Sequence, residues 1–299
     1  MKKHIPVLLD NVLEVLAPRS GEVFADLTAG YGGHSEALLE RVGDTGFGYL
    51  FDRDPEAVEY LQTKFTGRSN VKIIKSDFGD IDWQVFSKKP DMILADIGVS
   101  SPQIDSPERG FSFSSEGALD MRMDATSQLT AYDIVNGYTE KDIADILYKY
   151  GEERQSRAIA SEIVKQRNIS EIKTTTQLAD IISNRIGRHG KINSATKSFQ
   201  ALRIAVNDEL GELDRLLKVI PEEVSIGGRV AIISFHSLED RMVKRSFKSL
   251  CTPRRNEFGQ IETDPEFSPV TKKPITGDKF DKSNPRARSA KLRAVEKIN

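Results

Sequence analysis

The stretch DLTAGYGGHS, residues 26–35, has the composition of a loop that holds a ligand against its backbone. Three glycines, Gly30, Gly32 and Gly33, fall within four positions directly after an apolar run. Glycine loses more backbone freedom on folding than other residues, so this choice indicates that another molecule approaches closely. Glycines that follow a strand and open a helix are typical of loops that bind a nucleotide-like cofactor. We therefore expect Gly30, Gly32 and Gly33 to bind a cofactor.

Acidic residues stand at or just past the ends of the predicted strands around this loop. Asp26 ends the first strand, Asp52 the second and Asp96 the fourth, while Asp77 and Phe78 follow the third. The carboxyl ends of parallel strands meet at one edge of a sheet, where folds of this kind bind ligands. An acid at the end of the second strand commonly binds ribose hydroxyls, and Asp52 fits that role.

Two features favour S-adenosylmethionine (SAM) over a nicotinamide dinucleotide. The dinucleotide fingerprint is GxGxxG, but Ser35 stands where its third glycine should be. Asp26 also lies where it would repel a diphosphate and attract a sulfonium and an ammonium. A nicotinamide oxidoreductase remains the alternative on pattern alone.

Asp52, Asp26 and Phe78 also have purely structural interpretations. Asp52 could cap the helix that starts at Pro55, although Asp54 is better placed for that. Asp26 could hold its own turn, and Phe78 could simply belong to the core. Only the ordered set of acids, glycines and aromatic residue favours the cofactor interpretation.

The first hundred residues alternate between strand and helix patterns, which predicts an α/β fold with a doubly wound parallel sheet. Continuous apolar runs such as MILA are typical of buried parallel strands. The predicted strands cover 22–27, 48–51, 71–74 and 92–95, and the predicted helices cover 35–41 and 55–65.

After Asp96 the alternation stops, and an all-helical insertion is expected before the sheet resumes. Residues 100–128 read as an ordered loop, and the apolar run within 227–237 reads as a buried strand. The segment 290–298 is interpreted as a final edge strand. The predicted helices of this part are 139–150, 152–166, 176–186 and one long helix over 198–219. The expected domains are 1–104, a substrate-recognition insertion at 105–206, and 207–299.

The bulk composition indicates a soluble globular protein with an uneven charge. The chain has 299 residues, 38% hydrophobic and 29% charged, and its one cysteine, Cys251, excludes a disulfide framework. Residues 241–299 carry 15 Lys and Arg against 7 Asp and Glu, although the whole chain is at −2. Such a basic tail suits a polyanion, and a solvated tail with no partner is the alternative. No leader or membrane span is apparent, so a cytoplasmic protein is expected.

Further blocks carry a specific resemblance. The sequence continues past Asp96 as DIGVSSPQIDSPERGFSFSSEGALDMRMD, and later contains FHSLEDRMVK and NPRARSAKLR. With HIPVLLDNVLEVL near the start, these blocks closely resemble the bacterial RsmH (MraW) family, whose members are SAM-dependent methyltransferases of small-subunit ribosomal RNA. The matching blocks extend to residue 293.

The resemblance implies a class I, Rossmann-like methyltransferase fold with a helical insertion, SAM as cofactor, and methylation of the exocyclic N4 of a cytidine in the decoding region of 16S rRNA. The expected partner is 16S rRNA, within an assembled 30S particle, with no membrane; the oligomeric state, including a homodimer, is left open. By matching position, the resemblance implies that SAM contacts Gly32, Gly33, His34, Asp52, Phe78, Asp96 and Gln103.

Cytosine N4 is a poor nucleophile, because its lone pair is delocalised into the ring. Acceptors that hydrogen-bond the amino protons would make it more reactive, and Asp96, Ser100 and Ser101 are the candidates. His236 follows a strand end and is a further catalytic candidate. A loop histidine satisfied by Asp240 is its structural alternative. No catalytic metal is expected.

Base extraction from a structured RNA calls for stacking and phosphate contacts. Phe111 and Phe113 beside Arg109 could supply the stacking, and packing of both rings inside the loop is the alternative. The phosphate candidates are Arg241, Lys244, Arg245, Arg254, Arg255, Arg286, Arg288 and Arg293. Two rival functions are a non-catalytic RNA-binding assembly factor and a methyltransferase of a protein or small molecule.

Overall fold

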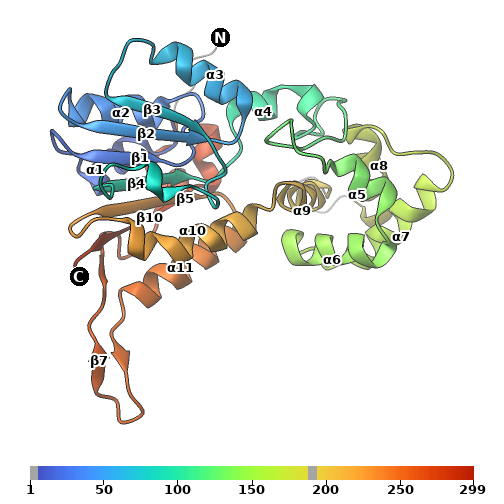
Figure 1. Ribbon diagram of the computed structural model, residues 1–299. Coiled ribbons are helices and arrows are strands. Elements are labelled where there is room, and N and C mark those ends of the chain that lie inside the picture. The colour runs from blue at the N-terminus through green and yellow to red at the C-terminus, as the bar shows by residue number, and fades with distance from the viewer. Residues whose placement is uncertain (1–5, 188–193) are drawn as a thin grey trace. The chain divides into compact units, whose positions relative to one another are not determined.

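The computed structural model describes residues 6–187 and 194–299, which fold as two compact units. One unit comprises the chain up to Gly98 and again from Leu210, and the other comprises Val99–Glu209. The first is built on a sheet and the second on helices (Figure 1). The insertion was expected to cover residues 105–206. The second unit starts earlier, at Val99, and ends later, at Glu209.

The sheet unit has a parallel core and an antiparallel extension. Its strand order is β3-β2-β1-β4-β5-β10-β8, with β9 also paired to β10. Strands β1 to β5 are parallel, whereas β10 is antiparallel to its neighbours. The strands are Val23–Asp26 (β1), Phe47–Asp52 (β2), Val71–Lys75 (β3), Met92–Asp96 (β4), Arg229–Ser234 (β5), Phe267–Pro269 (β8), Ile275–Thr276 (β9) and Lys291–Lys297 (β10).

Expecting a terminal edge strand at 290–298 was wrong. Strand β10 lies inside the sheet, because Lys291–Lys297 pairs with β5 on one side and with β8 and β9 on the other. Its burial pattern includes three buried residues, Leu292, Ala294 and Val295. The alternating charges that suggested an edge therefore coexist with pairing on both sides.

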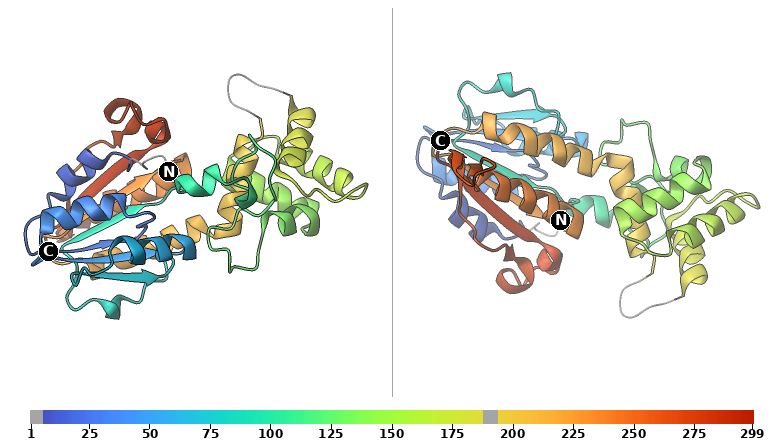
Figure 2. Two further views of the ribbon diagram at one scale, coloured as in Figure 1. Left: turned by 90° about the horizontal axis from the view of Figure 1, so that it is seen from above. Right: turned by 90° about the horizontal axis from the view of Figure 1, so that it is seen from below.

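Helices cover both faces of the sheet because successive strand residues point to opposite faces. Phe24 and Leu50 face one hydrophobic cluster, and their neighbours Ala25 and Phe51 face the other. Helices α1 (Leu9–Leu16), α2 (Gly33–Val42) and α3 (Pro55–Lys64) pack on the first face, while α10 (Glu209–Glu223) and α11 (Ser237–Leu250) pack on the second (Figures 1 and 2).

Short elements complete the sheet unit. Strands β6 (Arg254–Arg255) and β7 (Ile261–Thr263) form a separate hairpin that projects away from the sheet (Figure 1). The remaining elements are the 3-10 turns η1 (Trp83–Val85) and η3 (Pro285–Ser289) and the helix α12 (Gly277–Phe280).

The helical unit has its own hydrophobic core, built from the apolar faces of five helices. These helices are α5 (Ala131–Gly137), α6 (Glu140–Gly151), α7 (Ser156–Arg167), α8 (Thr175–Ile186) and α9 (Thr196–Asn207). The expected loop over 100–128 also contains α4 (Ser101–Asp105) and the turn η2 (Pro107–Arg109). In the part of the chain that the structure describes, no helix is both long and apolar enough to cross a membrane.

A single helix over 198–219 was also a wrong expectation. The chain forms α9 and α10 instead, and Asp208 between them has φ 49°. A left-handed residue cannot continue a right-handed helix, so the two helices are separate despite one shared apolar pattern.

Candidate active site

The glycine loop lies at the point where the strand order reverses. Strand β1 pairs with β2 on one side and β4 on the other, and a ligand of such a fold binds beyond the carboxyl ends of the strands at this point. Gly30 and Gly32 have φ 51° and 71°, a left-handed region that favours glycine. The loop therefore requires glycine at these two positions and passes directly into α2.

Asp52 holds the glycine loop by direct hydrogen bonds. Its carboxylate accepts from the backbone N–H of Gly30 at 2.7 Å and from that of Asp54 at 2.8 Å. Asp54 accepts in turn from Glu56 and caps α3, as its position suggested. The structural interpretation of Asp52 as the helix cap is therefore wrong, and its carboxylate lies against the loop.

Asp26 is almost completely buried at the end of β1. Its side chain is 1% exposed and accepts from the Ser35 hydroxyl at 2.6 Å and the Thr28 backbone N–H at 3.3 Å. The turn-holding interpretation is therefore correct in part, because Asp26 does bond the backbone two residues on. The same carboxylate fixes the first turn of α2 through Ser35.

Asp96, at the end of β4, has an oxygen without a partner. Among the described residues no hydrogen bond reaches its buried Oδ1, although Oδ2 lies 3.9 Å from Nδ1 of His34. An unsatisfied buried carboxylate oxygen is costly, so this atom suits a ligand that brings an N–H or O–H donor or a positive charge.

Burial shifts the titration of all three acids. It raises the pKa of Asp26 and of Asp52 to about 6, from 3.8. Burial, with the charges of Asp26 and Glu239 adding to it, raises the pKa of Asp96 to about 8. A cation placed among these groups would favour their ionised forms. The site is thus electrostatically prepared for a positively charged ligand.

Several residues that position the loop have no recognisable signal in the sequence. Lys64 on α3 donates to the carbonyl oxygens of Tyr31 and Gly32 at 3.2 and 3.0 Å. The carbonyl oxygen of Val7 accepts from Nε2 of His34 at 2.9 Å, and this gives the His34 imidazole a structural role. Such pairs are far apart in sequence, and spacing cannot reveal them.

Phe78 follows β3 and is 9% exposed, within the hydrophobic cluster on the α10 side of the sheet. The structure thus supports its packing role, and contact with SAM stays a prediction. Gln103, Ser100 and Ser101 belong to the helical unit, whereas Asp96 belongs to the sheet unit. Ser100 and Gln103 form a capping box at the start of α4, so both side chains already have a structural role.

His236 is bound by Glu239 and not by Asp240. The Nδ1 atom of His236 accepts from the backbone N–H of Glu239 at 3.4 Å, and Nε2 lies 3.0 Å from the Glu239 carboxylate. Asp240 instead binds Arg293 and Lys291 at 2.8 and 3.1 Å. The expected partner of His236, Asp240, was therefore wrong. Helix α11 begins at Ser237, so His236 is its N-cap residue and Glu239, in the first turn, lies against it.

Three candidate RNA contacts have structural roles as well. Arg109 donates to the carbonyl oxygens of Arg122 and Met123 at 3.1 and 2.9 Å. Phe113 packs edge-on against Phe199 with ring centres 4.7 Å apart, which supports the packing alternative. Arg293 is held by Asp240. The remaining phosphate candidates, Arg241, Lys244, Arg245, Arg254, Arg255, Arg286 and Arg288, are exposed, whereas Phe111 is half-buried.

One acidic cluster in the sheet unit could hold a metal ion by geometry alone. Asp77, Asp80 and Glu212 have carboxylate oxygens within 4.8 Å of one another. Arg53 binds Asp77 at 2.6 Å, and Arg215 binds Asp80 and Glu212 at 3.0 and 2.7 Å. Because these cations already compensate the acids, we interpret the cluster as an ion-pair network.

The sheet order, the glycine loop and the desolvated acids define a class I, Rossmann-like SAM-dependent methyltransferase. The profile of the MraW methylase family matches residues 1–298, and the chain belongs to this family.

Curated relatives extend over the whole chain. "Ribosomal RNA small subunit methyltransferase H" of Caldicellulosiruptor saccharolyticus is 45% identical over 100% of both chains. The protein of the same name from Rickettsia bellii is 44% identical over 99% of both. The solved structure of an rRNA methylase from Streptococcus thermophilus is 11% identical, with a TM-score of 0.42 over 97% of this chain and 94% of that one.

Proposed function

We propose that this enzyme transfers the methyl group of SAM to the exocyclic N4 of a cytidine in the decoding region of 16S rRNA. The observation that carries the proposal is that Oδ1 of Asp96, at the carboxyl edge of the sheet, has no hydrogen-bond partner within 6–187 and 194–299. Relatives of 45% and 44% identity bear the name of a small-subunit rRNA methyltransferase, which supports this substrate over a protein or a small molecule.

The residues present fit SAM. Asp26, Asp52 and Asp96 provide three desolvated carboxyl groups, and the backbone of Gly32, Gly33 and His34 is proposed to contact the cofactor. SAM, when bound, supplies a methyl group on a cationic sulfonium. Asp52 would bind its ribose hydroxyls while still holding the loop through Gly30. Phe78 and Gln103 are further proposed contacts.

The chain's task is mainly to position the cytosine amino group in line with the methyl donor, and positioning of this kind can lower a barrier by several kcal/mol, roughly up to 10. Asp96 would accept a hydrogen bond from N4–H and then hold the proton that N4 loses. Burial raises the pKa of Asp96 to about 8 in the ligand-free site, and the positive charge of bound SAM would lower it again, so that the carboxylate is ionised and can accept a proton near neutral pH. Ser100, Ser101 and His236 are proposed as neighbours of the base.

Ribosomal RNA as substrate implies a cytoplasmic enzyme. We propose that the enzyme acts on this RNA within the assembled 30S particle. The test uses 30S subunits and naked 16S rRNA from cells that lack the enzyme, incubated with enzyme and SAM. Mass mapping should locate one added methyl on a decoding-region cytidine, at a higher rate in 30S subunits. Methyl incorporation elsewhere, or none, would refute the proposal.

The role of Asp96 is tested separately by single-turnover rates at saturating SAM. Asp96→Asn keeps the shape of the side chain but removes the base, and Asp96→Ala removes both. We expect losses of at least about a hundredfold in each, within the range for general-base catalysis. Wild-type rates in both variants would exclude Asp96 from the chemistry.

A further inference from the structure

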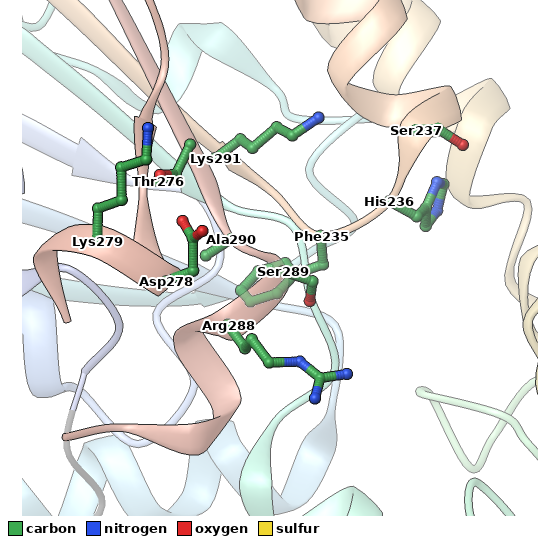
Figure 3. Close-up of a pocket in the computed structure, with 10 residues that line it drawn as sticks. All are labelled: Phe235, His236, Ser237, Thr276, Asp278, Lys279, Arg288, Ser289, Ala290 and Lys291. Carbon is green, nitrogen blue, oxygen red and sulfur yellow. The ribbon is translucent and has the colours of Figure 1, made fainter. Parts of the chain in front are cut away.

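A cavity lies in the sheet unit beyond the end of β5. It has a volume of about 440 Å³. Its walls are the start of α11, the segment from β9 into α12, and the residues that enter β10 (Figure 3). The lining residues are Phe235, His236, Ser237, Thr276, Asp278, Lys279, Arg288, Ser289, Ala290 and Lys291.

This cavity adjoins the carboxyl edge at which Asp96 stands. Strands β4 and β5 are paired, with Asp96 opposite Ile233, and Phe235 follows two residues later. The Phe235 ring packs on Gly98 so closely that a Cβ there would lie 2.6 Å from a ring atom. The segment Phe235–His236 is therefore a wall of the cavity and also a neighbour of the proposed reaction centre.

The lining is predominantly cationic. Arg288 and Lys279 are exposed, and among the described residues neither has an ion-pair partner. Lys291 is paired with Asp240, and Asp278 is the acid of the lining. Figure 3 shows the Arg288 guanidinium and the Lys291 amine extending in the same direction, toward the side on which α11 begins. An anion is the ligand that this charge distribution favours.

The guanidinium of Arg288 suits an oxyanion in particular. The helix α11 begins at the cavity with Ser237, but the buried Glu239 carboxylate accepts from the backbone N–H groups of Phe235 and His236 at 2.7 and 3.2 Å, so the helix start adds no uncompensated positive charge. A guanidinium binds two oxygens of a phosphate at once. Phe235 and Ala290 give the cavity apolar surface, which a sugar or a base would cover.

We propose that this cavity binds the phosphodiester of an rRNA nucleotide that adjoins the target cytidine. Arg288 contacts the phosphate, Lys279 adds positive charge at the opposite end of the cavity, and the wall formed by Phe235 and His236 holds the sugar. This inference rests on the proposed rRNA substrate. The cavity would hold the RNA strand in place beside the base that reacts.

The test compares two charge-matched double variants with 30S subunits as the substrate. Arg288→Gln with Lys279→Gln removes the two unpaired cations of the cavity. Arg68→Gln with Lys72→Gln removes one arginine and one lysine, both exposed, at the β3 edge of the same sheet unit. Thermal melting with SAM verifies that both proteins fold.

We expect the cavity variant to raise KM for 30S subunits about tenfold, with KM for SAM and the rate at saturating 30S unchanged. Each phosphate contact contributes roughly 0.7–0.9 to the log–log slope of affinity against salt. The slope should therefore be shallower by about 1 in the cavity variant and unchanged in the control variant. Equal KM values and equal slopes in the two variants would overturn the inference.

A third variant separates the cavity from the general field of the basic tail. Ser289→Phe fills the cavity without changing the charge, and it should also raise KM for 30S subunits. A wild-type KM in this variant would overturn the inference even if the charge variants behave as expected. Failure of the wild-type enzyme to methylate 30S subunits would refute the proposed function, and the inference with it. Methylation with unaffected cavity variants would refute the inference alone.

Discussion

The imidazole of His34 lies between the N-terminal segment and Asp96, with Nδ1 3.9 Å from an Asp96 carboxylate oxygen. Its Nε2 faces the carbonyl oxygen of Val7 at 2.9 Å. A carbonyl oxygen only accepts, so Nε2 carries the proton and Nδ1 presents its lone pair toward Asp96 in the neutral ring. The neutral ring therefore brings no positive charge to Asp96, whose pKa is raised by burial and by the charges of Asp26 and Glu239.

SAM should bind more tightly as pH rises. Burial raises the pKa of Asp96 to about 8 and that of Asp26 and Asp52 to about 6. A bound cation favours the ionised acids, so binding releases protons below these values. We expect the Kd for SAM to fall from pH 6 to pH 8 and then to level off. Calorimetry in buffers of different ionisation enthalpy measures the number of protons released when SAM binds. Asp96→Asn should remove the part of the dependence between pH 7 and pH 8.

The ligand-free protein should lose stability over the same range. A carboxyl group whose pKa is higher in the folded than in the unfolded chain gives the folded state more bound protons, so the free energy of unfolding falls as pH rises. For Asp26, Asp52 and Asp96 this applies between about pH 4 and about pH 8. Melting scans should show a declining Tm that saturating SAM reverses. A Tm that rises from pH 6 to pH 8 without SAM would contradict the assignment.

Asp52 and Asp54 offer a matched pair, two residues apart. Asp52→Asn should raise KM for SAM at least about tenfold, because the amide cannot accept both hydrogen bonds from Gly30 and Asp54 with its single oxygen. Asp54→Ala removes the cap of α3 and should cost about 1 kcal/mol of stability. Steady-state kinetics and melting should show the two effects separately. A similar KM in both variants would mean that Asp52 has only a structural role.

Gly32 and Gly67 have similar φ angles, so substituting each by alanine distinguishes the cost of backbone strain from the cost of a steric clash. Gly32 and Gly67 have φ 71° and 82°, but a Cβ at Gly32 would lie 2.9 Å from Leu61, whereas at Gly67 it meets nothing within 4 Å. Gly67→Ala should cost about 1–2 kcal/mol from backbone strain. Gly32→Ala should cost more and weaken SAM binding. Equal loss of stability with unchanged SAM affinity in both would show that the loop tolerates a side chain.

Arg293 should matter for stability more than for RNA. Although burial opposes it, hydrogen bonds from Arg293 and Lys291 hold the pKa of Asp240 below its usual value. Arg293→Gln leaves this carboxylate partly unpaired, at a cost of about 1–3 kcal/mol. Arg288→Gln, at an exposed position, should leave Tm unchanged. Urea unfolding of both variants measures the difference, and a stable Arg293→Gln protein would favour the phosphate role.

The central strands were predictable because buried parallel strands consist of continuous apolar residues, which is a local pattern. MILA and the run before Phe235 are examples, and the acids at the strand ends followed from the same reading. The position of β10 was not predictable, because pairing on both sides is a tertiary property that composition does not encode. Likewise, α9 and α10 share one apolar period, and only the backbone angle of Asp208 separates them.

Partners of side chains were less predictable than positions. The cap of α3 by Asp54 followed a local rule, whereas the pairing of His236 with Glu239 depends on where α11 begins. The contacts of His34 with Val7 and of Lys64 with the glycine loop join residues about 30 positions apart. Long-range contacts of this kind give charged groups partners within the chain, as Asp240 does for the candidate RNA contact Arg293, and the RNA contacts stay predictions.

The interior place of β10 has a consequence for biosynthesis. A ribosome completes residues 99–209 as one continuous stretch, so the helical unit can fold while translation continues. The sheet unit must wait for Lys291–Lys297, which pairs with β5, β8 and β9. Until Lys291–Lys297 has been made and has paired, an open sheet edge remains at β5, and a nascent chain that stops before this segment keeps that edge exposed to aggregation.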